Sequence, residues 1–222
     1  KGDQTRVLDV GTGTGKWAIA YADFYNDQVI VTGVDIRAIQ PEWVPGNCFF
    51  EIYDCEEQWS WNDEFDYIRV SGTAGCFKDV QALIKKAFEN LRPGGILQMV
   101  DFYLFLRRGD GDGTPDDPAS ELFRLHAKAA NNLGRPIDVV LQYPKMMQKA
   151  GFELVDADVF KVPANPWPLD ERRREVGSLM QEFITSDLEG MVVDRLMSGA
   201  EITSEEAMVF CAATRTRLKE NS

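Results

Sequence analysis

The chain has a single histidine, His126, and only four cysteines among its 222 residues. The cysteines, Cys48, Cys55, Cys76 and Cys211, show no C-x-x-C spacing, so with one imidazole they form a poor set of zinc ligands. We therefore predict no metal site. We interpret the cysteines as reduced thiols of a cytosolic or nuclear protein.

Basic residues are also scarce, with 24 Lys and Arg against 36 Asp and Glu, for a net charge of −12. This balance argues against a broad surface for a phosphate backbone, so we expect no direct nucleic-acid partner. No apolar run approaches the length of a membrane span and no signal peptide is visible, so we expect no membrane partner. The chain begins at Lys1, and we interpret it as a stretch of a longer protein.

The sequence does contain a glycine-rich turn between an expected strand and an expected helix. Residues 6–16 read RVLDVGTGTGK, in which apolar residues precede three alternating glycines, Gly11, Gly13 and Gly15, and helix-forming residues follow them. Strand, glycine turn and helix make the first half of a βαβ unit. Its glycines let the backbone approach a ligand closely.

The spacing of these glycines separates three classes of ligand. A dinucleotide fingerprint, G-x-G-x-x-G, would need its third glycine at Lys16, and a Walker A loop fails because Val10 and Trp17 stand at its two ends. The pattern present is D-x-G-x-G-x-G, with Asp9 at the end of the strand. A carboxylate there suits a ligand with a cationic end, such as the amino group and sulfonium of S-adenosylmethionine.

Two further acids follow expected strands. Asp35 ends the second strand, 20 residues beyond Gly15, where an acid in a doubly wound fold accepts hydrogen bonds from ribose hydroxyls. Asp54 ends the third strand and is a candidate acceptor for the exocyclic amine of an adenine. The alternative for Asp54 is a solvated turn.

Hydrophobic periodicity predicts an α/β fold. We expect helices over 16–25 and 77–91, and strands over 6–10, 29–34, 48–53, 64–70 and 96–103. This alternation predicts a doubly wound, mostly parallel Rossmann-like sheet. Its ligand would bind at the carboxyl ends of the strands, where the loop 71–75 follows the fourth strand.

The second half of the chain is more helical. The loop 107–117 lacks the residue order of a calcium loop, and we interpret it as a mobile excursion over the active site. We expect helices over 119–133 and 144–150, an edge strand over 152–162, and C-terminal helices interrupted near Gly190 and resumed at a Thr203 capping box. No seventh strand is visible. We predict a single domain over 1–222, with a cofactor-binding half over 1–105 and a substrate-side half over 106–222.

The glycine turn followed by Asp35 and Asp54 resembles the class I S-adenosylmethionine-dependent methyltransferases. More narrowly, the segments GTGTGKWAI, VDIRAIQPEWVPGNCFFEI and FKVPANPW resemble the fungal LaeA-like methyltransferases, which are associated with control of secondary metabolism and development. The resemblance implies a Rossmann-like fold, S-adenosylmethionine as cofactor and S-adenosylhomocysteine as product. It also implies a set of cofactor-binding residues: Asp9, Gly11, Thr12, Gly13, Gly15, Asp35, Ile36, Asp54, Cys55, Val70 and Ser71.

The resemblance leaves the methyl acceptor open between a small molecule and a protein. Because the cofactor carries the reactive group, no catalytic side chain is required, and His126 is the only candidate for a general base. The alternative for His126 is a structural role in its helix. The family also suggests a second function, that of a cofactor-binding regulator with little turnover that acts in the cytoplasm or nucleus with velvet-family partners.

Overall fold

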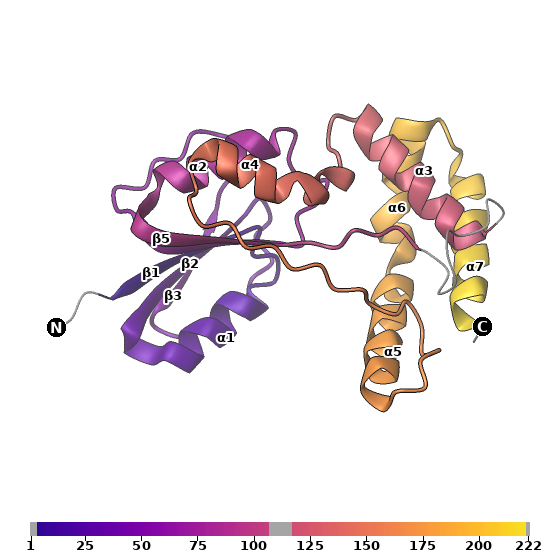
Figure 1. The fold of residues 1–222 in the computed structure, drawn as a ribbon, viewed down its shortest axis with the longest axis horizontal. Helices are drawn as coiled ribbons and strands as arrows, with labels where there is room; N and C mark the ends of the chain where they lie inside the picture. Colours follow the sequence, from indigo (N-terminus) through magenta and orange to yellow (C-terminus); the bar gives the residue numbers. More distant parts are fainter. Residues whose placement is uncertain (1–3, 107–116, 221–222) are drawn as a thin grey trace. The chain divides into compact units, whose positions relative to one another are not determined.

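A computed structural model describes residues 4–106 and 117–220. The chain divides into two compact units. The sheet unit comprises Lys1–Phe102 and Val139–Asp156, and the helical unit comprises Tyr103–Asp138 and Ala157–Ser222. Both units can be followed by colour and label in Figure 1.

The sheet unit contains a five-stranded sheet with the order β3-β2-β1-β4-β5, and every pair of neighbours is parallel. The strands are β1 (Thr5–Val10), β2 (Val29–Asp35), β3 (Cys48–Ile52), β4 (Phe65–Ser71) and β5 (Leu91–Val100). The chain builds outward from β1 to β3 on one side and then from β4 to β5 on the other. The order therefore reverses between β1 and β4, which is where sheets of this kind bind ligands.

Helices cover both faces of the sheet, as the doubly wound prediction requires (Figure 1). The helix α1 (Lys16–Tyr25) packs on one face through a core that includes Val7, Ala18 and Val31. The helices α2 (Val80–Glu89) and α4 (Tyr143–Ala150) cover the other face. Two short 3-10 helices, η1 (Asn26–Gln28) and η2 (Asp138–Gln142), complete the connections.

The helical unit has its own core. It contains α3 (Pro118–Asn132), α5 (Glu171–Ser186), α6 (Leu188–Ala200) and α7 (Ser204–Lys219). Fully buried side chains such as Phe123, Leu188 and Leu196 form its centre. The predicted capping box at Thr203 is present, with reciprocal hydrogen bonds between Thr203 and Glu206. Asp117 caps α3 and also pairs with Arg217 of α7.

The fold class is as predicted, but some elements differ. The predicted edge strand over 152–162 is wrong, because that segment pairs with no strand of the sheet. Among the described residues β5 pairs only with β4, and Leu154 and Phe160 of the segment are largely exposed. A strand needs a hydrogen-bonded neighbour as well as an alternating pattern. The predicted loop over 107–117 lies, except for Asp117, outside the described residues.

Smaller differences concern where elements begin and end. The helix predicted over 77–91 is shorter, because Asp79 caps the start of α2 and Asn90 caps its end. The fifth strand begins at Leu91, and the glycines before Ile96 fall within an irregularity of its pairing with β4. The break in the C-terminal helices lies at Asp187 instead of Gly190.

Candidate functional site

The glycine turn lies at the carboxyl end of β1 and has the backbone that its glycines predict. Gly11, Gly13 and Gly15 all have positive φ, at 69°, 58° and 76°. A Cβ added at Gly11 would lie 2.8 Å from Cγ2 of Thr73, whereas one added at Gly13 would meet no atom within 4 Å. Gly13 therefore presents its backbone to open space, which a ligand can approach.

Asp9 is fully buried beneath this turn. Its Oδ1 accepts from Nη1 of Arg69 at 2.8 Å, and its Oδ2 accepts from the hydroxyl of Thr12 at 2.7 Å. Burial raises the pKa of Asp9, while the hydrogen bonds from Thr12 and Arg69 oppose that rise. Asp9 thus ties the glycine turn to β4. The expectation that it also lies beside a bound cofactor stays a prediction.

Asp35, at the end of β2, contacts the turn directly. Its Oδ2 accepts from the backbone N–H of Gly13 at 2.9 Å, and its Oδ1 accepts from that of Arg37 at 3.0 Å. Gln40 donates to the carbonyl of Gly13 at 2.7 Å, so both polar groups of that residue's backbone are fixed. Each carboxylate oxygen of Asp35 retains a lone pair for a further donor. Next to it, Ile36 is 68% exposed and offers an apolar surface.

The turn after β3 carries Asp54 and Cys55. Asp54 is exposed and accepts from the N–H of Glu56 at 2.8 Å, so one of its oxygens closes the turn. Burial, followed by the charge of Asp54, raises the pKa of the Cys55 thiol to about 12, so this thiol is a poor nucleophile. If the two residues hold an adenine, Asp54 can use its carboxylate and Cys55 its backbone.

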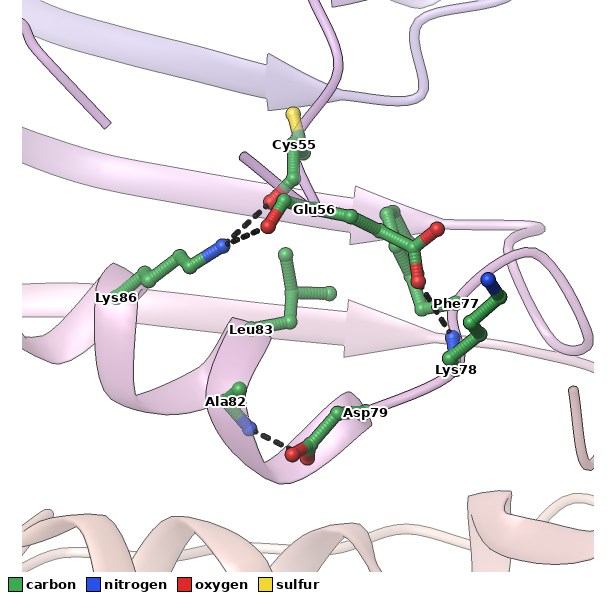
Figure 2. Close-up of a pocket in the computed structure, with 8 residues that line it drawn as sticks. All are labelled: Cys55, Glu56, Phe77, Lys78, Asp79, Ala82, Leu83 and Lys86. Carbon is green, nitrogen blue, oxygen red and sulfur yellow. Dashed lines mark hydrogen bonds between the residues drawn. The ribbon is translucent and has the colours of Figure 1, made fainter. Parts of the chain in front are cut away.

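Lys86 of α2 holds this turn, a role that sequence reasoning did not identify. Its Nζ donates to the carbonyls of Cys55, Glu56 and Glu57 at 3.1, 2.6 and 2.7 Å. Figure 2 shows the first two of these bonds beside a small pocket whose lining also includes Phe77. An ammonium group that donates to three converging carbonyls fixes the backbone of the turn.

The loop after β4 is anchored by a network that sequence reasoning also missed. Asp101, just beyond β5, accepts from the N–H of Ala74 at 2.9 Å and from the hydroxyl of Tyr143 at 2.8 Å. Burial raises the pKa of Asp101, and these hydrogen bonds oppose the rise. Of the two predicted site residues here, Val70 buries its side chain in the core, whereas Ser71 is half-buried at the strand end.

The structure thus brings most predicted site residues to one edge of the sheet unit, at the carboxyl ends of its strands. They come from β1 and its turn, from the end of β2, from the turn after β3 and from the end of β4. Long-range pairing produces this arrangement, because the carboxyl ends of parallel strands share an edge.

His126 belongs to the helical unit and is buried on α3. Its Nε2 lies 3.1 Å from Nη1 of Arg195, and its Nδ1 is buried without a hydrogen-bond partner among the described residues. Burial, and then the charge of Arg195, lowers its pKa to about 4. A neutral imidazole enclosed in a helical core fits the structural alternative, and its role as a base stays a prediction.

Two kinds of feature are absent from the described residues. Within 4–106 and 117–220, no three His, Cys, Asp or Glu side chains gather as a metal site. None of the helices described is long and apolar enough to cross a membrane.

Comparison with known proteins gives one family match and several relatives. A family model described as a methyltransferase domain matches residues 1–157. Methyltransferase pytC of Aspergillus terreus is 32% identical over 215 residues, which cover 97% of this chain and 66% of that protein. The secondary metabolism regulator LAE1 of Cochliobolus heterostrophus is 32% identical over 191 residues, covering 85% of this chain and 62% of LAE1. The chain thus spans less than two thirds of each relative.

A solved structure has the same fold. Phosphoethanolamine N-methyltransferase 2 of Haemonchus contortus, in complex with S-adenosyl-L-methionine, matches with a TM-score of 0.56 and 20% identity. The match covers 99% of this chain and 46% of that protein. At this identity the likeness concerns the fold alone.

Proposed function

Because this chain belongs to the methyltransferase domain family, we propose that it binds S-adenosylmethionine and transfers a methyl group to an acceptor. When bound, the cofactor supplies an electrophilic methyl group on a sulfonium. Similarity to methyltransferase pytC supports methyl transfer, and similarity to the secondary metabolism regulator LAE1 supports an acceptor or a regulatory role within secondary metabolism. The acceptor is either a small molecule or a protein side chain.

One observation carries the proposal. The backbone of Gly13 is open to a ligand. The carboxylate of Asp35 lies beside it, with Oδ2 of Asp35 2.9 Å from the backbone nitrogen of Gly13. A backbone free of side chains suits the close approach of the amino-acid part of the cofactor, and a fixed carboxylate suits its ribose hydroxyls. The exposed Ile36 and the turn at Asp54 and Cys55 follow on the same edge, where an adenine would need an apolar wall and a polar acceptor.

In this proposal the residues of the chain position the reactants, and good positioning can contribute about 7–11 kcal/mol to lowering a reaction barrier. Asp35 and Gln40 fix the backbone of Gly13 from both sides. Asp101 fixes the loop after β4, which borders the same edge. Because the cofactor carries the methyl group and the chain positions the reactants, no catalytic side chain is needed. His126 remains a candidate base only for an acceptor that must lose a proton.

Calorimetric binding of S-adenosylhomocysteine tests the cofactor assignment. We expect tight binding by the unsubstituted chain and weakening of about 1.5–3 kcal/mol in Asp35→Ala, since a charged acceptor of hydrogen bonds is lost. Asp23→Ala removes an exposed carboxylate from α1 and serves as the matched control. NADH binding as tight as that of S-adenosylhomocysteine, or unchanged affinity in Asp35→Ala, would contradict the assignment.

A second function is favoured by the similarity to LAE1, which is described as a regulator of secondary metabolism. Here the chain would bind the cofactor with little turnover and act with a velvet-type protein partner in the cytoplasm or nucleus. Incubation with methyl-labelled S-adenosylmethionine and candidate acceptors separates the two. Multiple turnovers on any acceptor would support the enzyme, and tight binding without transfer would support the regulator.

A further inference from the structure

Arg69 lies at the point where the strand order reverses. It is the third residue from the end of β4, and its register partner on β1 is Asp9. Strands buried on both faces are normally apolar, so an arginine near the end of such a strand calls for a specific reason. Its ion pair with Asp9, at 2.8 Å, accounts for one of its nitrogens.

The rest of the guanidinium group is held in place but still has donors to offer. Its central carbon lies 4.4 Å from the centroid of the Trp17 ring, so a cation–π contact holds the group over that ring. The side chain of Arg69 remains 18% exposed. Within the described part of the chain, only Nη1 has a hydrogen-bond acceptor, so Nε and Nη2 are available to a ligand.

The charges around Arg69 are mostly negative. Burial raises the pKa of Asp9, and the nearby charge of Asp35 adds to the rise. Burial also raises the pKa of Asp101; hydrogen bonds from Ala74 and Tyr143 oppose that rise, and so does the charge of Arg69. A ligand that brings its own carboxylate to this edge would be repelled by these three acids unless a cation received it.

We propose that Arg69 binds the α-carboxylate of the cofactor's amino-acid part, through the guanidinium nitrogens that Asp9 leaves available. This inference rests on the proposed function and assigns a residue to one end of that ligand. A planar guanidinium held over the Trp17 ring and anchored to Asp9 is preorganised to receive a carboxylate by paired hydrogen bonds. Asp9 and Thr12 then serve to position Arg69 and the turn relative to each other.

Two ligands that differ only in the carboxylate test this directly: S-adenosylmethionine and decarboxylated S-adenosylmethionine. In the unsubstituted chain we expect calorimetry to show about 10- to 100-fold tighter binding of the first, the range for hydrogen bonds with charged partners. In Arg69→Gln the ratio should fall close to one, because S-adenosylmethionine loses affinity and the decarboxylated ligand does not.

Three further variants keep the test decisive. The double variant Asp9→Asn/Arg69→Gln avoids leaving a buried carboxylate unpaired, and it should also show a ratio close to one. Lys16→Gln and Arg37→Gln remove exposed cations near the same turn and should keep the original ratio.

An unchanged ratio in Arg69→Gln and the double variant, or equal losses for both ligands, would overturn the inference and leave Arg69 as a structural partner of Asp9. Collapse of the ratio in Lys16→Gln or Arg37→Gln would overturn it as well. If the unsubstituted chain binds neither ligand, the proposed function fails and the inference fails with it. Binding of both ligands at equal strength by the unsubstituted chain would overturn the inference alone.

Discussion

The three glycines of the turn after β1 meet different surroundings. Gly13 faces open space, whereas a Cβ on Gly15 would lie 2.8 Å from Cε1 of Phe50. Both have positive φ, so a substitution at either position strains the backbone. Only Gly13 has open space beside it, so a substitution there would affect the proposed ligand without displacing a neighbouring side chain.

We therefore expect Gly13→Ala to affect mainly ligand binding and Gly15→Ala to affect mainly stability. Gly13→Ala should lower the free energy of unfolding by only about 1–2 kcal/mol, the cost of a left-handed alanine, while weakening S-adenosylhomocysteine binding more than about tenfold. Gly15→Ala should lower stability by about a further 1–3 kcal/mol through overpacking against Phe50. Chemical denaturation and calorimetry measure both quantities, and equal stability losses would contradict the distinction.

The burial of His126 predicts that the free energy of unfolding depends on pH. The effect can be assigned to one imidazole because the chain has no other histidine. Its pKa is about 4 in the folded state, below the ordinary 6.5, because of burial and then Arg195. The unfolded chain therefore takes up the proton first as the pH falls. The free energy of unfolding should drop between pH 6.5 and 4, by up to about 3 kcal/mol.

The variant His126→Gln cannot titrate and isolates this effect. The difference in unfolding free energy between it and the unsubstituted chain should change across that pH window and be constant above it. An NMR titration of the single imidazole provides a direct check. Parallel stability curves, or an imidazole pKa that stays at the ordinary value, would show that His126 is not enclosed as described.

At the level of elements, α2 supports the turn that follows β3. We expect Lys86→Met to lower the free energy of unfolding by about 1.5–3 kcal/mol and to weaken S-adenosylhomocysteine binding, since three carbonyls lose a charged donor. Lys85→Met on the same helix removes only an exposed bridge to Glu89 and should change stability by less than about 1 kcal/mol. Similar losses in the two variants would contradict this role of Lys86.

The order of strands and helices in the sheet unit could be predicted because its signals are local. Apolar runs, the glycine turn and the helix that starts at Lys16 all lie in short stretches of sequence. The failed strand over 152–162 had the right local pattern but no neighbour to pair with, and pairing is a property of the sheet as a whole. Element boundaries shifted where caps such as Asp79 and Asn90 decided them.

The site divides in the same way. The placement of Asp9, Asp35 and the glycines at the ends of strands could be predicted from spacing, whereas the contacts of Arg69 and Lys86 depend on which strands and helices become neighbours. The strand register that sets Arg69 against Asp9 joins positions 60 residues apart, and no local pattern encodes it. In the sequence, Arg69 is one of two charged residues, with Asp66, on a strand predicted to lie inside the sheet, and that is the only local signal that pointed to it.

At the scale of the whole molecule, the sheet unit is built from two separate segments of the chain. The second segment supplies α4, and its Tyr143 bonds to Asp101 while the carbonyl of Met146 accepts from Gln81. The predicted single domain over 1–222 stays a prediction, but the sheet unit itself needs the later segment for one face of its core.

We therefore expect residues 1–102 alone to fail to fold cooperatively. The same residues joined to 139–156 by a flexible Gly/Ser linker should recover a cooperative thermal transition, because α4 again covers α2. Circular dichroism and the binding of a hydrophobic dye distinguish the two fragments. A cooperative transition in residues 1–102 alone would mean that α4 is dispensable for the sheet.

The ring of Phe50 on β3 occupies the space beside two glycines, Gly15 in the turn and Gly33 on β2, where an added Cβ would lie 2.6 Å from its Cε1. These three positions therefore share one volume. In evolutionary terms they form a covarying set: relatives with a larger residue at position 15 or 33 should carry a smaller one at position 50. Position 13 should vary independently of that set, because a Cβ there would meet no atom within 4 Å and so does not share the space of Phe50.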